Sequence, residues 1–211
     1  MDSPGYDALP RGRHHLTREQ VVASQRYRLL QGITEVVAEK GYLRTSVADV
    51  LKRARVSRET FYEHFSDKQE CFLTAFEENA ELLLEVVERA AGPAGEPGLT
   101  RLERTLVAYL EGLAGDPAGA RTFLLEVYAV GPPAAARRFQ IQRRFVELIN
   151  GLLRDDDRWL RLPDPEFASR MVVGGVAALV TGLVAQGDHA ALPALREPIM
   201  AHVRTLIDPA R

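Results

Sequence analysis

TSVADVLKRARVSRETFYEHFSDK, residues 45–68, is the stretch that decides the fold of this chain. It predicts two short helices joined by a tight turn and followed by the start of a third helix. Serine is a favoured residue just before a helix, because its hydroxyl accepts a hydrogen bond from a backbone N–H of the first turn. The N-cap candidates are Ser46 with Asp49, Ser57, and Ser66 with Gln69, and the first and last of these are capping boxes.

The second of these helices has one side that is expected to be buried and one that is expected to be exposed. Val56, Phe61 and Phe65 recur at helical spacing and are expected to face inward. The other side carries hydrogen-bond donors and an aromatic hydroxyl, as in a helix-turn-helix whose second helix enters the major groove of DNA. An ordinary helical hairpin with a polar face is the alternative. The outward side chains are expected to be Arg58, Glu59, Thr60, Tyr62 and His64.

The same stretch resembles the signature of the TetR family of transcriptional regulators, over about Tyr27–Phe72. Two residues depart from the family's pattern. Arg55 stands at the turn position where the family has glycine, which disfavours a positive φ but places a cation within reach of a phosphate. Glu59 replaces a small residue and so changes the expected base preference. The residues that carry the resemblance are Gly41, Tyr42, Thr45, Ser46, Val47, Val56, Ser57, Thr60, Phe61, Tyr62, His64, Phe65 and Lys68.

The resemblance implies a DNA-binding regulator, and a repressor in particular. Its target would be double-stranded DNA, a pseudo-palindromic operator with half-sites about 34–36 Å apart or a multiple of that distance. Arg58 and Thr60 would meet base edges, in agreement with the bidentate recognition of guanine by arginine. The residues that would meet phosphates or adjacent bases are Thr45, Ser46, Tyr62, His64 and Lys68.

The pattern along the chain predicts an all-α protein with an N-terminal three-helix helix-turn-helix DNA-binding domain and a C-terminal helical ligand-binding and dimerisation domain. No alternation long enough for a strand is present. Residues 1–16 are expected to be a disordered basic arm, either a solvated tail or a reader of the minor groove. Residues 17–70 are expected to be the DNA-binding domain and residues 71–211 the second domain. Outside residues 45–68, helices are expected at 17–40, 66–91, 99–114, 117–130, 133–154, 165–187 and 190–207.

Charge is spread unevenly along the chain, whose formal net charge is −2. Residues 1–70 carry 12 basic and 10 acidic side chains, and residues 71–211 carry 15 and 19. This mild asymmetry excludes a nucleic-acid coating over the whole surface and predicts a local DNA contact in the N-terminal third.

The helix expected at 165–187 contains MVVGGVAALVTGLVAQG, residues 171–187, which is apolar nearly all round. A helix without a polar face must be covered on every side. Either it is the central core helix of a monomer, or one side packs against another subunit. The small residues Gly174, Gly175, Ala178 and Gly182 favour close approach of a second helix. In proteins of the TetR type the last two helices form the dimer interface, so a homodimer through these two helices is expected.

The middle of the chain is rich in aromatic residues that lie on separate expected helices. Such residues are the ordinary content of a helical core, yet in a domain attached to a DNA-reading head they also fit a small-molecule cavity. The expected effector is a small apolar or amphipathic molecule. The candidate ligand-binding residues are Tyr109, Phe123, Tyr128, Phe145 and Trp159.

Catalytic, metal and cofactor motifs are missing from the sequence, so no enzyme activity, no metal and no cofactor is expected. The single Cys71 excludes an intrachain disulfide and fits a reducing cytoplasm, where the protein is expected to reside. No uninterrupted apolar run reaches the roughly 18 residues of a membrane helix, so no membrane partner is expected.

Two other classes of protein remain open at this point. One is an all-α ligand-binding protein or enzyme in which the N-terminal helix pair is structural. The other is an interaction module in which the helix pair binds another protein. Retardation of a specific DNA fragment separates the first from a regulator, and a steep loss of binding with rising salt separates the second.

Overall fold

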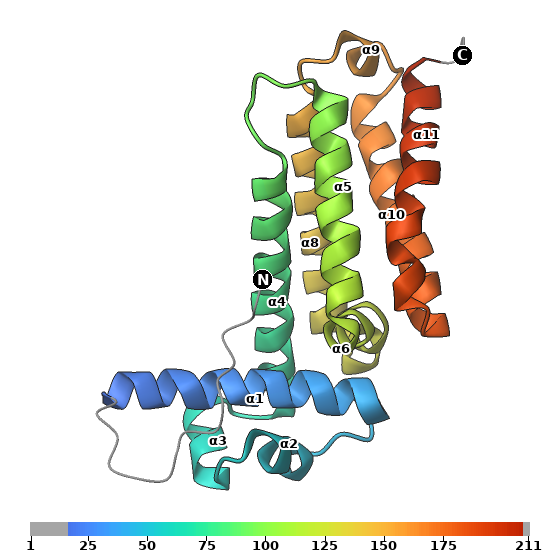
Figure 1. The fold of residues 1–211 in the computed structure, drawn as a ribbon. Coiled ribbons are helices and arrows are strands. Elements are labelled where there is room, and N and C mark those ends of the chain that lie inside the picture. Colours follow the sequence, from blue (N-terminus) through green and yellow to red (C-terminus); the bar gives the residue numbers. More distant parts are fainter. Residues whose placement is uncertain (1–16, 209–211) are drawn as a thin grey trace. The chain divides into compact units, whose positions relative to one another are not determined.

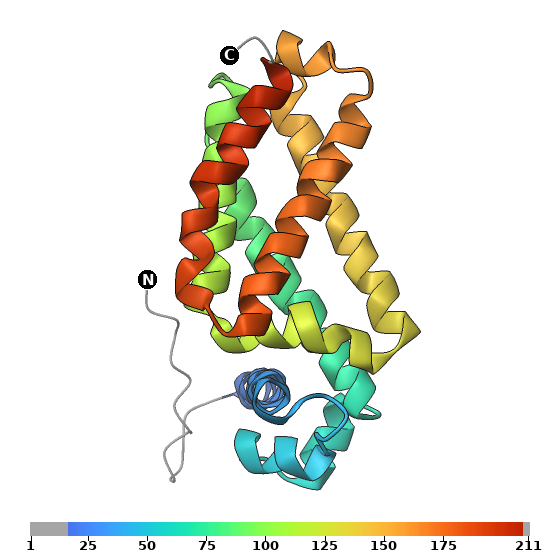
Figure 2. The same cartoon turned by 90° about the vertical axis from the view of Figure 1, so that its right-hand side faces the viewer.

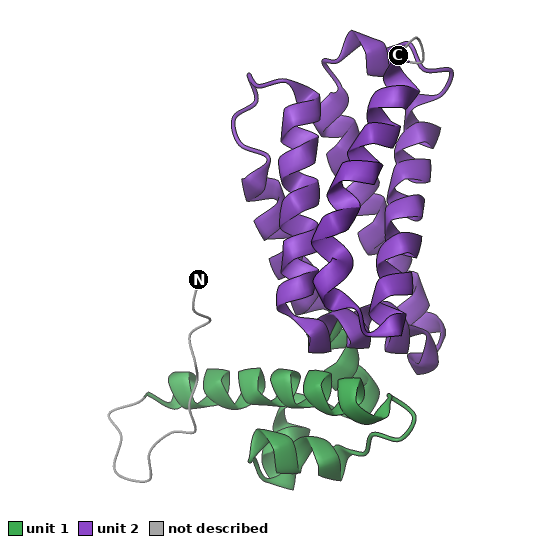
Figure 3. Ribbon diagram, turned by 45° about the vertical axis from the view of Figure 1, so that its right-hand side comes forward, with its two compact units in different colours: residues 1–76 green, residues 77–211 purple. Residues whose placement is uncertain are grey.

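The computed structural model describes residues 17–208, so the predicted N-terminal arm lies outside the described residues. These residues form helices and connecting turns without a strand, which confirms the all-α prediction (Figure 1). The chain divides into two compact units, residues 1–76 and residues 77–211 (Figure 3). The sequence had placed the boundary at residue 70, a few residues earlier.

The first unit consists of α1 (Arg18–Lys40), α2 (Val47–Ala54), α3 (Arg58–His64) and the first turns of α4 (Lys68–Ala90). The caps of the first three helices are those that the sequence predicts. Thr17 and Gln20 form the capping box of α1, and Ser46 and Asp49 form that of α2. Ser57 accepts the N–H of Thr60 at 3.0 Å at the start of α3.

The core of the first unit joins α1 to the helix pair that follows it. Gly32 of α1 lies close to α2, since a Cβ there would be 3.4 Å from the Cβ of Ala54 and from the carbonyl oxygen of Val50. Phe61 is fully buried, so one side of α3 is fixed from within. The side chains buried in this unit include Leu29, Leu30, Ile33, Val36, Val37, Val50, Ala54, Phe61, Phe65, Cys71 and Phe72.

The second unit is a bundle of longer helices (Figures 1 and 2). Its core is apolar: Leu110, Leu153, Val180, Val184, Leu192 and Met200 are all fully buried. Its elements are the rest of α4, α5 (Gly98–Gly115), α6 (Pro117–Arg121), η1 (Thr122–Glu126), α7 (Val127–Val130), α8 (Pro132–Leu153), α9 (Asp157–Leu160), α10 (Pro165–Gln186), η2 (His189–Leu195) and α11 (Arg196–Ile207).

Two details of the predicted helix ends are wrong. Helix α4 begins at Lys68, the N–H of Glu70 donates to the Asp67 carboxylate at 2.8 Å, and the Glu70 carboxylate accepts the N–H of Ser66 at 2.7 Å. The cap of α4 is therefore shifted by one residue from the predicted pair of Ser66 and Gln69. The last expected helix begins as the 3₁₀ segment η2, because Pro193 has no N–H with which to continue an α-helix.

The prediction about membrane helices also needs correction. Within residues 17–208, α10 is long and apolar enough to cross a membrane by length and composition. Its most apolar window has a mean hydropathy of 1.8, and only 22% of that window is buried. The prediction counted the uninterrupted run from Met171 to Ala185, whereas α10 begins at Pro165 and has one basic residue, Arg170, before that run.

Candidate nucleic-acid interface

Helix α3 is short, and its outward side is free to meet a partner. It has seven residues, too few to be stable through its own hydrogen bonds, so its position depends on the burial of Phe61 and Phe65. Arg58, Glu59, Tyr62 and Glu63 are exposed, and Thr60 and His64 are partly buried. The prediction of the outward face is thus confirmed for Arg58, Glu59 and Tyr62, and only in part for Thr60 and His64.

Arg58 and Tyr62 form a pair on this face. The guanidinium of Arg58 lies 5.5 Å from the centre of the Tyr62 ring, and one of its N–H groups points to the Tyr62 hydroxyl at 3.4 Å. A cation held over an aromatic ring loses less freedom when it binds a target. Thr60 is positioned in a different way, since its hydroxyl lies 2.9 Å from that of the capping Ser57.

The turn between α2 and α3 contains Arg55, which is the only non-glycine residue with positive φ among residues 17–208. Its φ of 54° and ψ of 49° are left-handed, a conformation that disfavours residues with a Cβ. Arg28 of α1 supports the turn, because it donates to the carbonyl oxygens of Ala54 at 3.1 Å and of Arg55 at 3.4 Å. The side chain of Arg55 is exposed next to α3.

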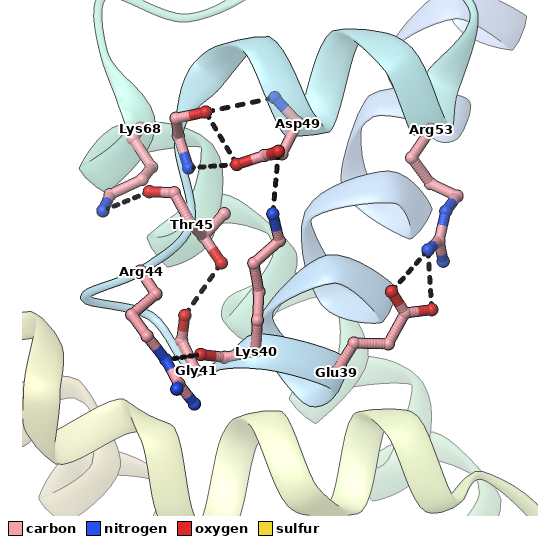
Figure 4. Close-up of polar contacts among 9 residues, drawn as sticks. Glu39, Lys40, Gly41, Arg44, Thr45, Asp49, Arg53 and Lys68 are labelled. Carbon is pink, nitrogen blue, oxygen red and sulfur yellow. Dashed lines mark hydrogen bonds and ion pairs between the residues drawn. The ribbon is translucent and has the colours of Figure 1, made fainter.

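Ion pairs hold α2 against the end of α1 (Figure 4). Lys40 pairs with Asp49 at 2.7 Å, and Arg53 pairs with Glu39 at 2.6 Å and with Glu35 at 2.7 Å. The hydrogen bonds that Asp49 accepts from Lys40 and from Ser46 hold the pKa of this carboxyl well below its usual range. The carboxylate thus stays charged at neutral pH, where it serves both the cap and the ion pair.

Two of the predicted DNA-contacting residues, Thr45 and Lys68, donate their side-chain hydrogen bonds to backbone carbonyl oxygens of the first unit. Thr45 is buried, and its hydroxyl donates to the carbonyl oxygen of Gly41 at 2.9 Å. The ammonium of Lys68 donates to the carbonyl oxygen of Thr45 at 2.8 Å (Figure 4). It also donates to the carbonyl oxygen of Tyr42 at 2.9 Å and lies 4.0 Å from the centre of the Tyr42 ring. Partial burial lowers the pKa of Lys68. Both side chains fix the α1–α2 turn, and their direct contact with DNA stays a prediction.

His64, at the end of α3, is only partly accessible. Burial and the nearby charge of Arg26 hold the pKa of His64 below its ordinary value, against the opposite effect of Glu63. The ring is therefore neutral at pH 7, so it would meet DNA as a hydrogen-bonding group and not as a cation. Its Nε2 atom is buried without a hydrogen-bond partner in the described chain.

The aromatic residues predicted to bind a ligand form two groups of two in the second unit, and the fifth is Trp159. Tyr109 of α5 and Phe145 of α8 are in edge-to-face contact, with ring centres 5.4 Å apart. Phe123 of η1 and Tyr128 of α7 both accept hydrogen bonds from one arginine of α8, through a carbonyl oxygen and a hydroxyl respectively. Trp159 lies on the short helix α9 in the hydrophobic core and is 1% exposed.

That arginine, Arg138, is the residue that the sequence reading missed. A signal was present, because Arg138 follows Ala134 by four residues and precedes Phe145 by seven, the spacing of the buried side of a helix. Arg28, which supports the turn between α2 and α3, is likewise not among the residues that the sequence predicts for the site. It precedes the buried Leu29, and no local pattern in α1 points to the carbonyl oxygens of α2.

Helix α10 exposes an apolar side. Phe167, Met171 and Leu179 are 58%, 62% and 50% exposed, and Gly174, Gly175 and Ala178 lie on the same surface. A Cβ added at Gly174, Gly175 or Gly182 would meet no atom within 4 Å. Packing within a single chain therefore does not require these small residues. Beside this surface, α8 and α10 enclose a groove of about 630 Å³.

Metal ligands do not converge in the described residues: no group of three or more His, Cys, Asp or Glu side chains is placed to hold an ion within residues 17–208. Cys71 is fully buried, and burial raises the pKa of its thiol to about 12.

Comparison with known proteins agrees with this geometry. The family model of bacterial regulatory proteins of the tetR family matches residues 29–75, which include the second half of α1, all of α2 and α3, and the start of α4. The HTH-type transcriptional activator FasR of Mycolicibacterium smegmatis is 27% identical over 113 residues, which are 54% of this chain and 51% of FasR. The chain thus spans about half the length of that relative.

Two further relatives match over most of their length. The fatty acid metabolism regulator protein of Bacillus subtilis is 23% identical over 177 residues, which are 82% of this chain and 90% of that protein. A solved structure of the transcriptional regulator FadR from Bacillus subtilis, in complex with stearoyl-CoA, has a TM-score of 0.74 at 22% identity and covers 86% of this chain and 97% of that chain. At this identity the structural likeness shows the fold.

Proposed function

We propose that this chain, whose residues 29–75 match the model of bacterial regulatory proteins of the tetR family, is a homodimeric transcriptional repressor that a small-molecule effector releases from a pseudo-palindromic operator. The observation that carries the proposal is the outward face of α3. It presents Arg58 and Tyr62 as a preformed pair on a helix that is fixed from below by Phe61. Arg58 then reads a base edge, and the neighbouring side chains position the helix on the backbone.

Dimer formation is supported by the exposed side of α10. A continuous apolar surface of this kind marks a contact surface on a protein in water. The free space above Gly174, Gly175 and Gly182 is suited to a helix of a second copy, which would approach closely where no side chain stands in the way. We place the dimer interface on α10 and α11, and a cytoplasmic DNA-binding dimer leaves this surface covered by protein and not by lipid.

The effector domain is the second unit, and the proposed effector is a fatty acid or its coenzyme A thioester. The names of the relatives motivate this class, since two are described by fatty acid metabolism or by a complex with stearoyl-CoA. Support within this chain comes from the aromatic residues Tyr109, Phe123 and Phe145, which bring apolar rings from α5, η1 and α8. Helix α4 runs from the first unit into the second and is the proposed path of coupling.

The direct test is the selection and sequencing of DNA fragments that the purified protein binds. A palindromic motif with half-sites about one or more helical turns apart is expected. Affinity should fall steeply with salt, as it does when cationic side chains release counterions from DNA. Binding without sequence preference, or binding that salt does not weaken, would favour a structural helix pair or a protein-docking module.

The effector proposal has its own test. Fatty acids and acyl thioesters of graded length should raise the melting temperature and release the operator fragment. A coupling of about 1–3 kcal/mol changes operator affinity roughly 5–150-fold. Phe145→Ala should alter the response to the effector and leave the ligand-free DNA affinity largely intact. Compounds that stabilise the protein without changing its DNA affinity would leave the second unit with dimerisation alone.

A further inference from the structure

Arg138 of α8 is a buried cation that has no carboxylate partner among residues 17–208. The residue is 8% exposed, although charged side chains are rarely so buried unless they are paired. The other arginines of this helix all reach a carboxylate, which makes Arg138 the exception. Their ion pairs join Arg137 to Glu77 at 2.9 Å, Arg143 to Glu147 at 3.8 Å, and Arg144 to Glu81.

The atoms that contact Arg138 are neutral oxygens and an aromatic ring. Its Nε donates to the hydroxyl of Tyr128 at 2.8 Å, and one terminal nitrogen donates to the carbonyl oxygen of Phe123 at 3.3 Å. Its guanidinium carbon lies 5.3 Å from the centre of the Tyr128 ring. A guanidinium has five N–H donors. The two recorded bonds therefore orient the group and leave donors available to an anion.

The two groups that accept hydrogen bonds from Arg138 lie in or just after a local irregularity of the backbone. Residues 122–126 form the π-helical segment η1, whose hydrogen bonds skip one residue more than those of an α-helix. Phe123 lies in this segment, and its carbonyl oxygen accepts from Arg138. Tyr128 follows two residues after the segment. π-Helical turns are rare and occur frequently at functional sites.

The surroundings of Arg138 supply apolar surface but no counter-charge. Tyr109 lies near enough for the charge of Arg138 to act on its hydroxyl, yet burial raises the pKa of Tyr109 to about 12. Its phenol thus remains neutral at pH 7. Tyr109 also contacts the ring of Phe145, so a chain of aromatic surface adjoins the cation.

We propose that Arg138 binds the oxyanion head of an amphipathic effector, a carboxylate or a phosphate, while the rings of Tyr109, Phe123 and Phe145 hold its apolar body. This inference rests on the proposed effector function of the second unit, and it names the group that the protein recognises. An anion would supply the charge that Arg138 lacks, and a charge-assisted bond to a guanidinium is stronger than one between neutral groups. The apolar chain alone would then bind weakly.

The test compares three probes that share a chain of equal length: laurate, dodecanol and lauroyl-CoA. Binding to the full-length dimer is measured by calorimetry without DNA. The wild type is expected to bind at least one of the two anions roughly 10–100-fold more tightly than the alcohol, the strength of a hydrogen bond to a charged group. In Arg138→Gln this preference should fall to less than about 3-fold, whereas Arg138→Lys should keep part of it. Arg144→Gln, which removes a surface ion pair from the same helix, should keep all of it.

Comparison of laurate with lauroyl-CoA also shows whether Arg138 binds a carboxylate or a phosphate. Loss of preference for laurate assigns a carboxylate to Arg138, and loss of preference for lauroyl-CoA alone assigns a phosphate. An unchanged preference in Arg138→Gln, or no binding of any probe, overturns the proposal. Arg138→Met gives a check that needs no ligand: removal of an unpaired buried charge should leave the melting temperature equal or higher. A large fall in that temperature would identify Arg138 as a structural clamp and would also overturn it. Failure of the wild type to retard any operator would overturn only the proposed function.

Discussion

The surroundings of α2 in the first unit and those of α8 and α10 in the second differ in how many of their side chains have partners within the described chain. In residues 17–76 the polar groups around α2 have partners close by: Ser46 has Asp49, Asp49 has Lys40, and Lys68 has two carbonyl oxygens. In residues 77–208, α10 exposes an apolar side and Arg138 is buried without a counter-charge. Under the proposed function, the first unit would meet duplex DNA with side chains that are already held in place, and the second would keep surfaces that a second copy and a ligand complete.

We expect the largest effect from a bulky side chain at one of the glycines on the exposed side of α10. Gly175→Leu or Gly182→Leu should fold as a monomer, because the added side chain meets no atom of its own chain within 4 Å, and should prevent close approach of the second copy. Loss of the dimer removes the gain from two linked heads and should weaken operator binding roughly 100-fold or more.

Sedimentation and DNA retardation measure both halves of this prediction. Gly115→Leu is the matched control, since Gly115 also has open space around its Cβ position but ends α5. If the α10 variants remain dimers with unchanged operator affinity, the exposed side of α10 is not the interface. The contrast between the paired polar groups around α2 and the uncovered apolar side of α10 would then lose its main support.

The next effect concerns the outward face of α3. Arg58→Ala removes the cation that Tyr62 positions, and should cost about 1–3 kcal/mol in operator binding and relax the preference at one base position. Arg53→Ala is a useful comparison, because Arg53 pairs with Glu35 and Glu39 and should affect stability more than base preference. Sequencing of selected fragments for both variants reads out the difference. An unchanged preference in Arg58→Ala would show that α3 does not enter the groove as proposed.

The same difference between the units explains which features the sequence could predict. Caps depend on residues three apart, so Thr17 with Gln20 and Ser46 with Asp49 are legible in the sequence and are confirmed. The α4 cap was misplaced by one residue because Ser66 and Asp67 are both good capping residues, and the tertiary position of the chain decides between them. Local chemistry thus predicts most of the first unit.

The second unit depends on contacts between distant residues, which leave little trace in a local pattern. The π-helical turn at Thr122–Glu126 has no sequence signature, and it shifts the residues that follow. Arg138 stands among several arginines on α8, and only its spacing from Ala134 and Phe145 distinguishes it. Trp159, a candidate ligand-binding residue from the sequence, lies on α9 in the hydrophobic core. Helix positions were predictable here, whereas the partners of individual side chains were not.

A smaller effect is expected at the capping boxes of α1 and α2, whose contributions to the free energy of unfolding should depend differently on pH. Ser46→Ala should lower the free energy of unfolding by about 0.5–2 kcal/mol, the ordinary cost of losing an N-cap.

Because the folded state lowers the pKa of Asp49, the contribution of this carboxylate to stability is fully present above the pKa of the unfolded chain, near 4, and declines as the pH falls below that value. The destabilisation caused by Asp49→Asn should therefore shrink in acid. Thr17→Ala is the control, since its box partner Gln20 does not titrate. Chemical unfolding between neutral pH and pH 3 measures these differences, and a pH-independent effect of Asp49→Asn would contradict the assignment.

The smallest effect is expected at Arg55 in the first unit. It tests whether the charge of this residue, whose backbone is strained, contributes to DNA binding. Its left-handed backbone disfavours any residue with a Cβ, so Arg55→Gly should relieve strain and change the free energy of unfolding by no more than about 1 kcal/mol, in the stabilising direction. The exposed guanidinium lies beside α3, where it is suited to a phosphate, and its loss should reduce the slope of log affinity against log salt by about 0.9. Arg55→Lys should restore the slope, and Arg55→Asn, which tolerates the same backbone, should lose it. A variant that is more stable but binds DNA less tightly, with a shallower salt dependence, would show that the turn exchanges stability for a contact. If the slope of log affinity against log salt is unchanged in Arg55→Gly, Arg55 makes no phosphate contact. The strained backbone at this residue would then have no role in DNA binding.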